Sequence, residues 1–239
     1  MFQDQGSLRL GSAFLALGLA AIAMAFTGQG WELNATMTWF GVAFFWVGLA
    51  YLFARPGFFL KRATGVLPPA SYLAYGPLLL FNLSGHYLFR RLSREKLCDP
   101  ICENLYLGGR LYASDRDLIE TLHLCAVLDL RAEFAESAPF RDLNYLSLPV
   151  LDACAPGLEQ LEQGVAWITQ QTAAGPVYVH CALGRGRSAT FVAAYLLASG
   201  RVASVTEAVD FVAQRRPQIG LTRSQRRSLE EFVARGSLH

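Results

Sequence analysis

Two long uncharged runs lie near the start of the chain and set it apart from an ordinary soluble domain. The first run is Leu10–Gly30 and the second is Leu33–Ala54, so they hold 21 and 22 residues without a charged side chain. A helix of about 20 apolar residues crosses the roughly 30 Å core of a bilayer. Because the second run follows at once, a helical hairpin is favoured over a cleaved signal peptide. We therefore predict two membrane spans, 10–30 and 33–54.

A third uncharged run, 63–89, has a different character. It contains Pro68, Pro69, Pro77, Asn82 and His86, which suit a regular lipid-facing helix poorly. Basic clusters precede the run at 55–62 and follow it at 90–96, and the positive-inside rule places both clusters in the cytoplasm. Because one span cannot do that, an interfacial or re-entrant element is favoured over a third span. We predict a membrane region over residues 1–96.

From residue 97 onward, strand-like and helix-like patterns alternate. Short apolar runs typical of buried strands lie at 104–107, 125–130, 145–150 and 177–180. Patterns typical of helices lie at 114–122, 158–174, 188–199, 204–215 and 222–235. This alternation predicts an α/β fold whose central, largely parallel sheet carries helices on both faces. We therefore predict one globular domain over 97–239, preceded by the N-terminal helical membrane region.

Composition agrees with this division and narrows the function. Hydrophobic residues make up 53% of the chain and charged residues 17%, and the apolar excess lies in the N-terminal part. With a net charge of only +2, the chain lacks the large positive charge that is typical of nucleic-acid-binding proteins. The odd number of cysteines, five, suits a reducing cytoplasmic compartment. The close pair Cys98 and Cys102 lacks a second pair of ligands, so no metal site is predicted.

The segment HCALGRGRS, residues 180–188, lies between the last predicted strand and an apolar helix. A glycine-rich loop before a helix gathers backbone N–H groups around an anion, and it stabilises a cysteine such as Cys181 as a thiolate. Arg187 returns to the rim of the loop, where a guanidinium binds two phosphate oxygens, and Ser188 is placed to donate a hydrogen bond to the sulfur. The predicted phosphate cradle comprises Ala182, Leu183, Gly184, Arg185, Gly186 and Arg187.

These residues match the HCxxGxxRS motif, and the chain from about Cys98 to Phe232 resembles the cysteine-dependent protein tyrosine and dual-specificity phosphatases. The resemblance implies that Cys181 attacks a phosphate monoester and forms a cysteinyl-phosphate, without a cofactor. It also implies that His180 orders the loop and tunes the thiolate, while Arg187 and Ser188 complete the site. The fold implied by the resemblance is the same α/β arrangement.

This chemistry requires a group that protonates the leaving oxygen and later activates water. The family uses an aspartate roughly 30 residues before the cysteine, and Asp152 lies 29 residues before Cys181 in the loop LPVLDACAP. The resemblance therefore implies Asp152 as the acid. Asp129, within a predicted strand, is the second choice and Asp142 the third. Cys154 is a resolving thiol for the nucleophile only if the fold brings the two together.

The region around the motif is similar to the mitochondrial phosphatidylglycerophosphate phosphatases, a lipid-directed group in this family, and Arg185 falls where that group also has a basic residue. Ala182 and Leu183 depart from its pattern. Because a membrane anchor concentrates the enzyme at the bilayer, we predict a multi-pass membrane phosphatase with a cytoplasmic catalytic domain that acts on a phosphorylated lipid. A tethered phosphoprotein phosphatase is the alternative, and a non-catalytic phospho-binding module is a remote one.

Overall fold

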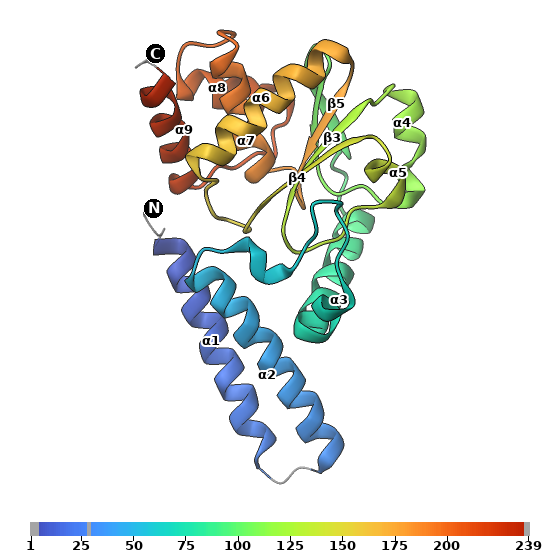
Figure 1. Ribbon diagram of the computed structural model, residues 1–239, viewed down its shortest axis with the longest axis vertical. Coiled ribbons are helices and arrows are strands. Elements are labelled where there is room, and N and C mark those ends of the chain that lie inside the picture. Colours follow the sequence, from blue (N-terminus) through green and yellow to red (C-terminus); the bar gives the residue numbers. More distant parts are fainter. Residues whose placement is uncertain (1–4, 28–29, 237–239) are drawn as a thin grey trace.

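A helical hairpin extends from a compact α/β domain in the computed structural model of the chain (Figure 1). The structure describes residues 5–27 and 30–236. Positions 28–29, which fall in the first predicted span, and positions 237–239, at the end of the predicted domain, lie outside the described residues. The start of the first helix and the end of the second both lie beside the α/β domain (Figure 1).

The hairpin consists of α1 (Gln5–Ala25) and α2 (Trp31–Leu52). Both helices are long and apolar enough to cross a membrane, and they are the two such helices in the part of the chain that the structure describes. They pack closely because glycines face each other: a Cβ added to Gly18 would lie 2.8 Å from the carbonyl oxygen of Gly41. Small residues at a contact are typical of paired membrane helices.

After the 3₁₀ turn η1 (Pro56–Phe59), the third uncharged run forms one interrupted helix, α3 (Pro69–Leu92). Tyr75 leaves the helical backbone conformation two residues before Pro77. Since proline has no N–H, the carbonyl of Leu73 loses its helical donor, and the indole N–H of Trp39 in α2 donates to that carbonyl at 2.8 Å. The interfacial placement of this run stays a prediction.

The sheet has five strands in the order β1-β2-β5-β3-β4. Their bounds are β1 Cys98–Cys102, β2 Leu105–Gly108, β3 Ala126–Arg131, β4 Asn144–Val150 and β5 Val177–His180. All neighbouring pairs are parallel except β1 with β2. The predicted largely parallel sheet is therefore confirmed, and β1 is an additional edge strand that the hydrophobic pattern did not indicate, since Pro100 interrupts it.

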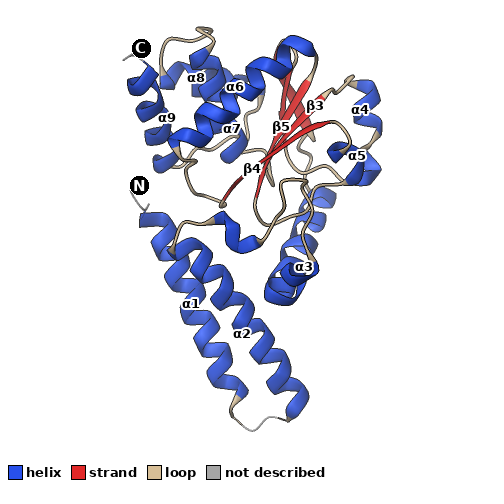
Figure 2. Cartoon of the chain, viewed as in Figure 1, coloured by secondary structure: helices blue, strands red, loops and turns tan. Residues whose placement is uncertain are grey.

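Helices cover both faces of the sheet, as the alternation predicted (Figure 2). One face carries α6 (Leu158–Ala174), α7 (Arg187–Ala198), α8 (Val205–Arg215) and α9 (Arg223–Gly236), and the other carries η2 (Ala113–Asp115), α4 (Asp117–Thr121) and α5 (Ala138–Arg141). Side chains alternate along each strand. In β5, Val177 and Val179 join the larger core under α6–α9, whereas Tyr178 joins the smaller core on the opposite face.

The N-terminal region packs into the α/β domain rather than only leading up to it. The Lys61 ammonium is buried and donates to the Asp129 carboxylate at 2.5 Å and to the Arg131 carbonyl at 2.8 Å. Phe59 and Tyr75 belong to one apolar cluster with buried side chains from the loops that follow β3 and β4. The hairpin end, α3 and the loops at the carboxyl edge of the sheet therefore form a continuous body.

Candidate active site

Cys181 directly follows β5, the central strand of the sheet, and α7 begins six residues later at Arg187. Cys181 is 3% exposed, and its Sγ lies 3.4 Å from the Ser188 hydroxyl oxygen. Between them the loop turns tightly at Gly184, which has φ +69°. A Cβ at this position would lie 2.3 Å from the backbone of Gly108 in β2, so this turn requires glycine.

The carbonyl of Ala182, the residue after Cys181, accepts two hydrogen bonds from outside the loop. The Arg110 backbone N–H donates to it at 2.9 Å, and His86 Nε2 lies 3.0 Å from it. Since a carbonyl oxygen only accepts, Nε2 carries the proton. Nδ1 then accepts from the Tyr112 hydroxyl at 2.8 Å. A histidine of α3 therefore contacts the residue next to Cys181.

Arg216 anchors the next part of the loop. Its guanidinium donates to the carbonyl of Gly184 at 2.7 Å and to that of Leu183 at 3.1 Å, and it pairs with Asp99 at 2.7 Å. The carbonyl of Arg185 accepts from a backbone N–H further along the chain. In a trans peptide the C=O and the following N–H point in opposite directions. Carbonyls that are bound from outside therefore favour N–H groups of residues 183–186 that face the loop centre, as the predicted phosphate cradle requires.

Arg187 is held at the rim by two carboxylates. Its guanidinium forms a two-pronged pair with Glu133 at 2.9 and 2.7 Å, and it also donates to the Val150 carbonyl at 3.0 Å. Asp152 is the second carboxylate, 3.0 Å from the same guanidinium, and its side chain is 69% exposed. The structure thus brings Cys181, Arg187, Ser188 and Asp152 together.

Opposing effects act on the Cys181 thiol. Burial raises its pKa, but the Arg187 charge and the hydrogen bonds from Ser188 lower it, and the result lies below the ordinary pKa of cysteine. The nearby Asp152 charge opposes this lowering. A cysteine with a lowered pKa is present more often as the nucleophilic thiolate at neutral pH.

His180 lies behind the loop in a buried charged network. Its Nε2 is 2.8 Å from the Glu136 carboxylate, which also pairs with Arg131 at 2.6 Å. The imidazole also stacks on Tyr178, with ring centroids 5.2 Å apart. Oxygen and nitrogen atoms of Asp129, Glu136 and His180 lie within 4.8 Å of one another, but Arg131 already binds both carboxylates. These contacts fix the ring below the nucleophile.

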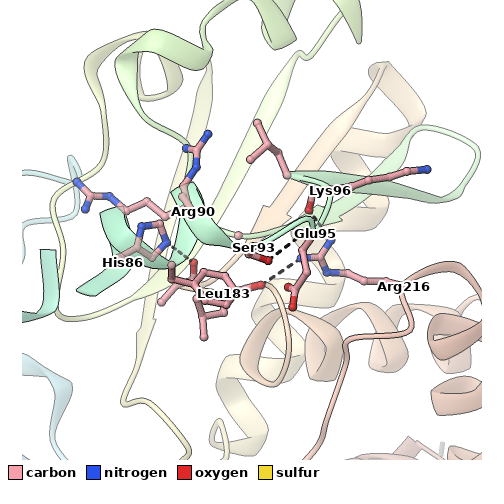
Figure 3. A pocket seen from close by; sticks show the side chains of 12 residues that line it. His86, Arg90, Ser93, Glu95, Lys96, Leu183 and Arg216 are labelled. Atoms are coloured by element: carbon pink, nitrogen blue, oxygen red, sulfur yellow. Dashed lines mark hydrogen bonds between the residues drawn. The ribbon is translucent and has the colours of Figure 1, made fainter. Parts of the chain in front are cut away.

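The side chain of Arg185 lies away from the loop centre. Its guanidinium pairs with Glu95 and stacks over the Phe89 ring at 5.3 Å from the centroid. Figure 3 shows this side of the loop, where the end of α3 and the segment to Lys96 meet Leu183 and Arg216. A role for the Arg185 side chain in phosphate binding stays a prediction.

Two further residues considered from the sequence, the second-choice acid Asp129 and the cysteine Cys154, are buried. Asp129 is fully buried, and although burial raises its pKa, the charges of Arg131 and Lys61 hold the pKa well below its ordinary value. It is therefore a structural partner and not an exposed acid. Cys154 is buried in the loop that carries Asp152, and its carbonyl accepts from the Gln225 amide at 3.0 Å. Its redox role stays a prediction.

The sequence did not predict three residues that support the catalytic loop, namely His86, Glu133 and Arg216. Glu133 gave the clearest signal, because it follows a buried strand at the same sheet edge as the nucleophile. Arg216 lies next to Arg215, and the order of residues around it is the same as for an arginine on the surface of a helix. His86 belongs to a segment predicted to be membrane-associated, so the chain offered no sign that it contacts the loop.

Comparison with known proteins agrees with this geometry. The model of the dual specificity phosphatase catalytic domain matches residues 105–235, more than half of the 239-residue chain. The chain is 30% identical over 179 residues to the phosphatidylglycerophosphate phosphatase PTPMT2 of Arabidopsis thaliana, across 72% of this chain and 77% of that protein. It is 34% identical over 114 residues to the dual specificity protein phosphatase 1 of Homo sapiens, across 47% of this chain and 30% of that protein.

A solved structure gives the same result. The crystal structure of PTPMT1 in complex with PI(5)P is 27% identical in sequence and has a TM-score of 0.55, and the match covers 60% of this chain and 98% of that chain. The likeness lies in the fold, and the family match over residues 105–235 includes the HCxxGxxRS motif at 180–188. The chain belongs to the dual specificity phosphatases, a family of phosphoric monoester hydrolases.

Proposed function

We propose that this chain is a membrane-anchored phosphatase that hydrolyses the phosphomonoester of a lipid headgroup through a cysteinyl-phosphate at Cys181. One observation carries the proposal: a buried thiol with a lowered pKa lies beside Ser188 in a loop whose carbonyls are bound from outside. The inward N–H groups and the Arg187 guanidinium bind the three non-bridging phosphate oxygens. The thiolate then lies directly below the phosphorus atom.

In the first step the Cys181 thiolate attacks phosphorus, an S–P bond forms and the bond from phosphorus to the leaving oxygen breaks. The Asp152 carboxylic acid donates its proton to that oxygen, so an alcohol leaves rather than an alkoxide. The exposed position of the Asp152 side chain at the rim supports this role. Arg187 stabilises the charge that spreads over the phosphoryl oxygens.

In the second step a water molecule attacks the phosphorus of the cysteinyl-phosphate. The Asp152 carboxylate accepts a proton from this water, the S–P bond breaks and inorganic phosphate is released. Ser188 donates a hydrogen bond to the departing thiolate, and both groups return to their initial protonation states once the product leaves. His180 acts as a positioning residue, because Glu136 and Tyr178 hold its ring below the loop.

A lipid substrate is supported by the similarity to PTPMT2 and by the position of the apolar helices. The hairpin and α3 pack directly on the loops of the site, so in this proposal the nucleophile lies close to the bilayer that the hairpin crosses. Exposed basic residues lie before and after α3, namely Arg55, Arg62, Arg94 and Lys96, and such residues attract anionic lipid headgroups. We take the catalytic domain to lie on the cytoplasmic side.

In this proposal α3 lies at the membrane interface. Several of its large apolar side chains are exposed, namely Tyr72, Leu73, Leu80, Phe81, Tyr87, Leu88 and Leu92. Its other side contacts the catalytic loops through His86. Reporter fusions at both ends of the chain test the arrangement, because two spans place both ends in the cytoplasm, whereas a third span at 63–89 places them on opposite sides.

The decisive experiment measures phosphate release by the detergent-solubilised chain from phospholipid monoesters, phosphopeptides and an aryl phosphate. We expect a phospholipid monoester to give the highest kcat/KM and Cys181→Ser to abolish turnover of every substrate, since a serine hydroxyl is not ionised at neutral pH. A preference for a phosphotyrosine peptide over every lipid identifies a tethered protein phosphatase instead. Appreciable turnover by Cys181→Ser rejects the mechanism itself.

A further inference from the structure

A large cavity lies between the hairpin, α3 and the catalytic loops. Its volume is about 740 Å³, within the range of about 300 to 1,000 Å³ that is typical of sites for small organic ligands. The walls come from segments that are far apart in the sequence: α1, α2, α3, the loop after β3, the loop after β4 and the loop after Cys181. Only the folded chain assembles this space.

The cavity walls follow one face of each helix. On α2 the lining residues recur at helical spacing, and they are Phe40, Phe44, Val47 and Tyr51. On α3 the same spacing gives Leu78, Asn82, Gly85 and Phe89. Since most of these side chains are apolar, the greater part of the cavity presents hydrocarbon and aromatic surface.

Polarity changes at the end of the cavity beside the catalytic site. There the lining includes Glu133 and Asp152, which both bind Arg187, together with Ala182 and Leu183 of the nucleophile loop. The cavity is therefore apolar along the helices and charged next to the phosphate cradle. Both lining charges are carboxylates, and they hold the Arg187 guanidinium of the cradle. An amphiphile therefore fits with its phosphate beyond these carboxylates, at Arg187 and the loop, and with its hydrocarbon between α2 and α3.

We propose that this cavity binds the acyl chains of the substrate, so that a phosphomonoester lipid enters with its phosphate at Cys181 and its hydrocarbon between α2 and α3. The inference rests on the proposed lipid phosphatase function and adds a chain-binding site to it. A lipid whose phosphate rises to the loop must withdraw the first part of its chains from the bilayer. Each methylene left in water instead would lower the population of that state about fourfold.

Gly85 offers a direct way to test the cavity. It lines the cavity on α3, and a Cβ at this position meets no atom within 4 Å. A side chain at this position therefore has room for its Cβ, and the indole of Gly85→Trp reduces the space in the cavity. Ser84→Trp is the matched control, since Ser84 is the preceding exposed residue of the same helix and lies outside the cavity lining.

The assay compares dioleoyl phosphatidylglycerophosphate in mixed micelles, its dihexanoyl counterpart and p-nitrophenyl phosphate, using the full-length chain. For Gly85→Trp we expect the kcat/KM ratio of the dioleoyl lipid to the aryl phosphate to fall about fifteenfold, as the exclusion of two methylene groups would cause. The dihexanoyl lipid falls less, and Ser84→Trp changes the ratio less than twofold. An unchanged ratio for Gly85→Trp, or an equal loss for both variants, overturns the proposal.

A second measurement does not depend on turnover. The Cys181→Ser chain is irradiated with phosphatidylglycerophosphate that carries a diazirine in one acyl chain, and labelled residues are mapped. We expect labels at 40–51 and 75–89, reduced by Gly85→Trp, and weaker labelling by diazirine phosphatidylcholine. Equal labelling by both lipids means that ordinary bilayer lipid fills the space, and labels confined to the outer faces of α1–α3 mean that the substrate chains stay in the bilayer. Either result rejects the inference.

The two proposals fail in different ways. If no lipid monoester is hydrolysed better than the aryl phosphate, the lipid phosphatase function is wrong and the cavity loses its proposed occupant. If the dioleoyl lipid is a good substrate but neither its chain length nor Gly85→Trp affects turnover selectively, the function stands and the chain-binding cavity is wrong.

Discussion

His86 of α3 donates a hydrogen bond at 3.0 Å to the carbonyl of Ala182, the residue next to the nucleophile. Tyr112 donates to the other ring nitrogen at 2.8 Å, so both nitrogens of the imidazole have partners. Burial lowers the pKa of His86, with a smaller opposing effect from the Ala182 bond, which favours the neutral ring at neutral pH. The helix that follows the hairpin is therefore joined directly to the catalytic loop.

Removing this bond is expected to impair the loop without unfolding the domain. His86→Ala should lower kcat/KM for an aryl phosphate by about tenfold at most, the range for one lost hydrogen bond. His86→Gln should recover part of that loss, because its amide can donate to the same carbonyl. Leu88→Ala, an exposed position on α3, serves as the control. Identical activities of the alanine and glutamine variants would argue against the hydrogen bond as the cause.

Glu133 should matter through Arg187. Its carboxylate holds the guanidinium by two hydrogen bonds of 2.9 and 2.7 Å, and the pair defines the plane in which Arg187 meets the phosphate. Glu133→Gln keeps the size of the side chain but loses the charge, so kcat/KM should fall by about 10-fold to 100-fold. Steady-state kinetics with an aryl phosphate measures the loss. The exposed Glu159→Gln on α6 is the control, and an equally active Glu133→Gln would mean that Arg187 needs no such partner.

Asp152→Ala should reveal general acid catalysis through its dependence on the leaving group. An alkyl phosphate, whose leaving oxygen is strongly basic, should lose about 10²-fold to 10⁴-fold in kcat. An aryl phosphate should lose much less, because its phenolate leaves without full protonation. The measurement compares both substrates in one buffer. Equal losses on the two substrates would remove Asp152 from the acid role.

Ser188 should influence the pH dependence of the thiol. Burial raises the pKa of Cys181, but the charge of Arg187 and the hydrogen bonds from Ser188 lower it by more. The thiolate therefore forms at a lower pH than that of an ordinary cysteine. Ser188→Ala removes one stabilising donor, so the pKa should rise and the thiolate should appear only at higher pH. The rate of inactivation by iodoacetate as a function of pH reports this directly. Ser199→Ala, at the far end of α7, should leave the profile unchanged, and an unshifted profile for Ser188→Ala contradicts the assignment.

The chain itself determined the catalytic loop and most of the fold. The spacing of Cys181, Gly184 and Arg187 is local, and a strand before and a helix after the loop suffice to bring these residues together. The predicted strand at 177–180 and the helix at 158–174 have the observed bounds, because a short apolar run and helical periodicity are themselves local patterns. The edge strand β1 was missed because Pro100 and a short length hide it, and its position depends on pairing with β2.

Only the tertiary structure decided which distant residues support the loop. Arg216 lies 35 positions after Cys181, and His86 lies 95 positions before it; their contacts depend on how α3 and α8 meet the sheet edge. The charge of Arg185 illustrates the same point, since its pairing with Glu95 spans a long stretch of chain. Hydrophobic periodicity determines which face of a helix is buried, but not which neighbour covers that face. The packing of α2 and α3 against the catalytic loops, and the cavity between them, follow from that choice of neighbours.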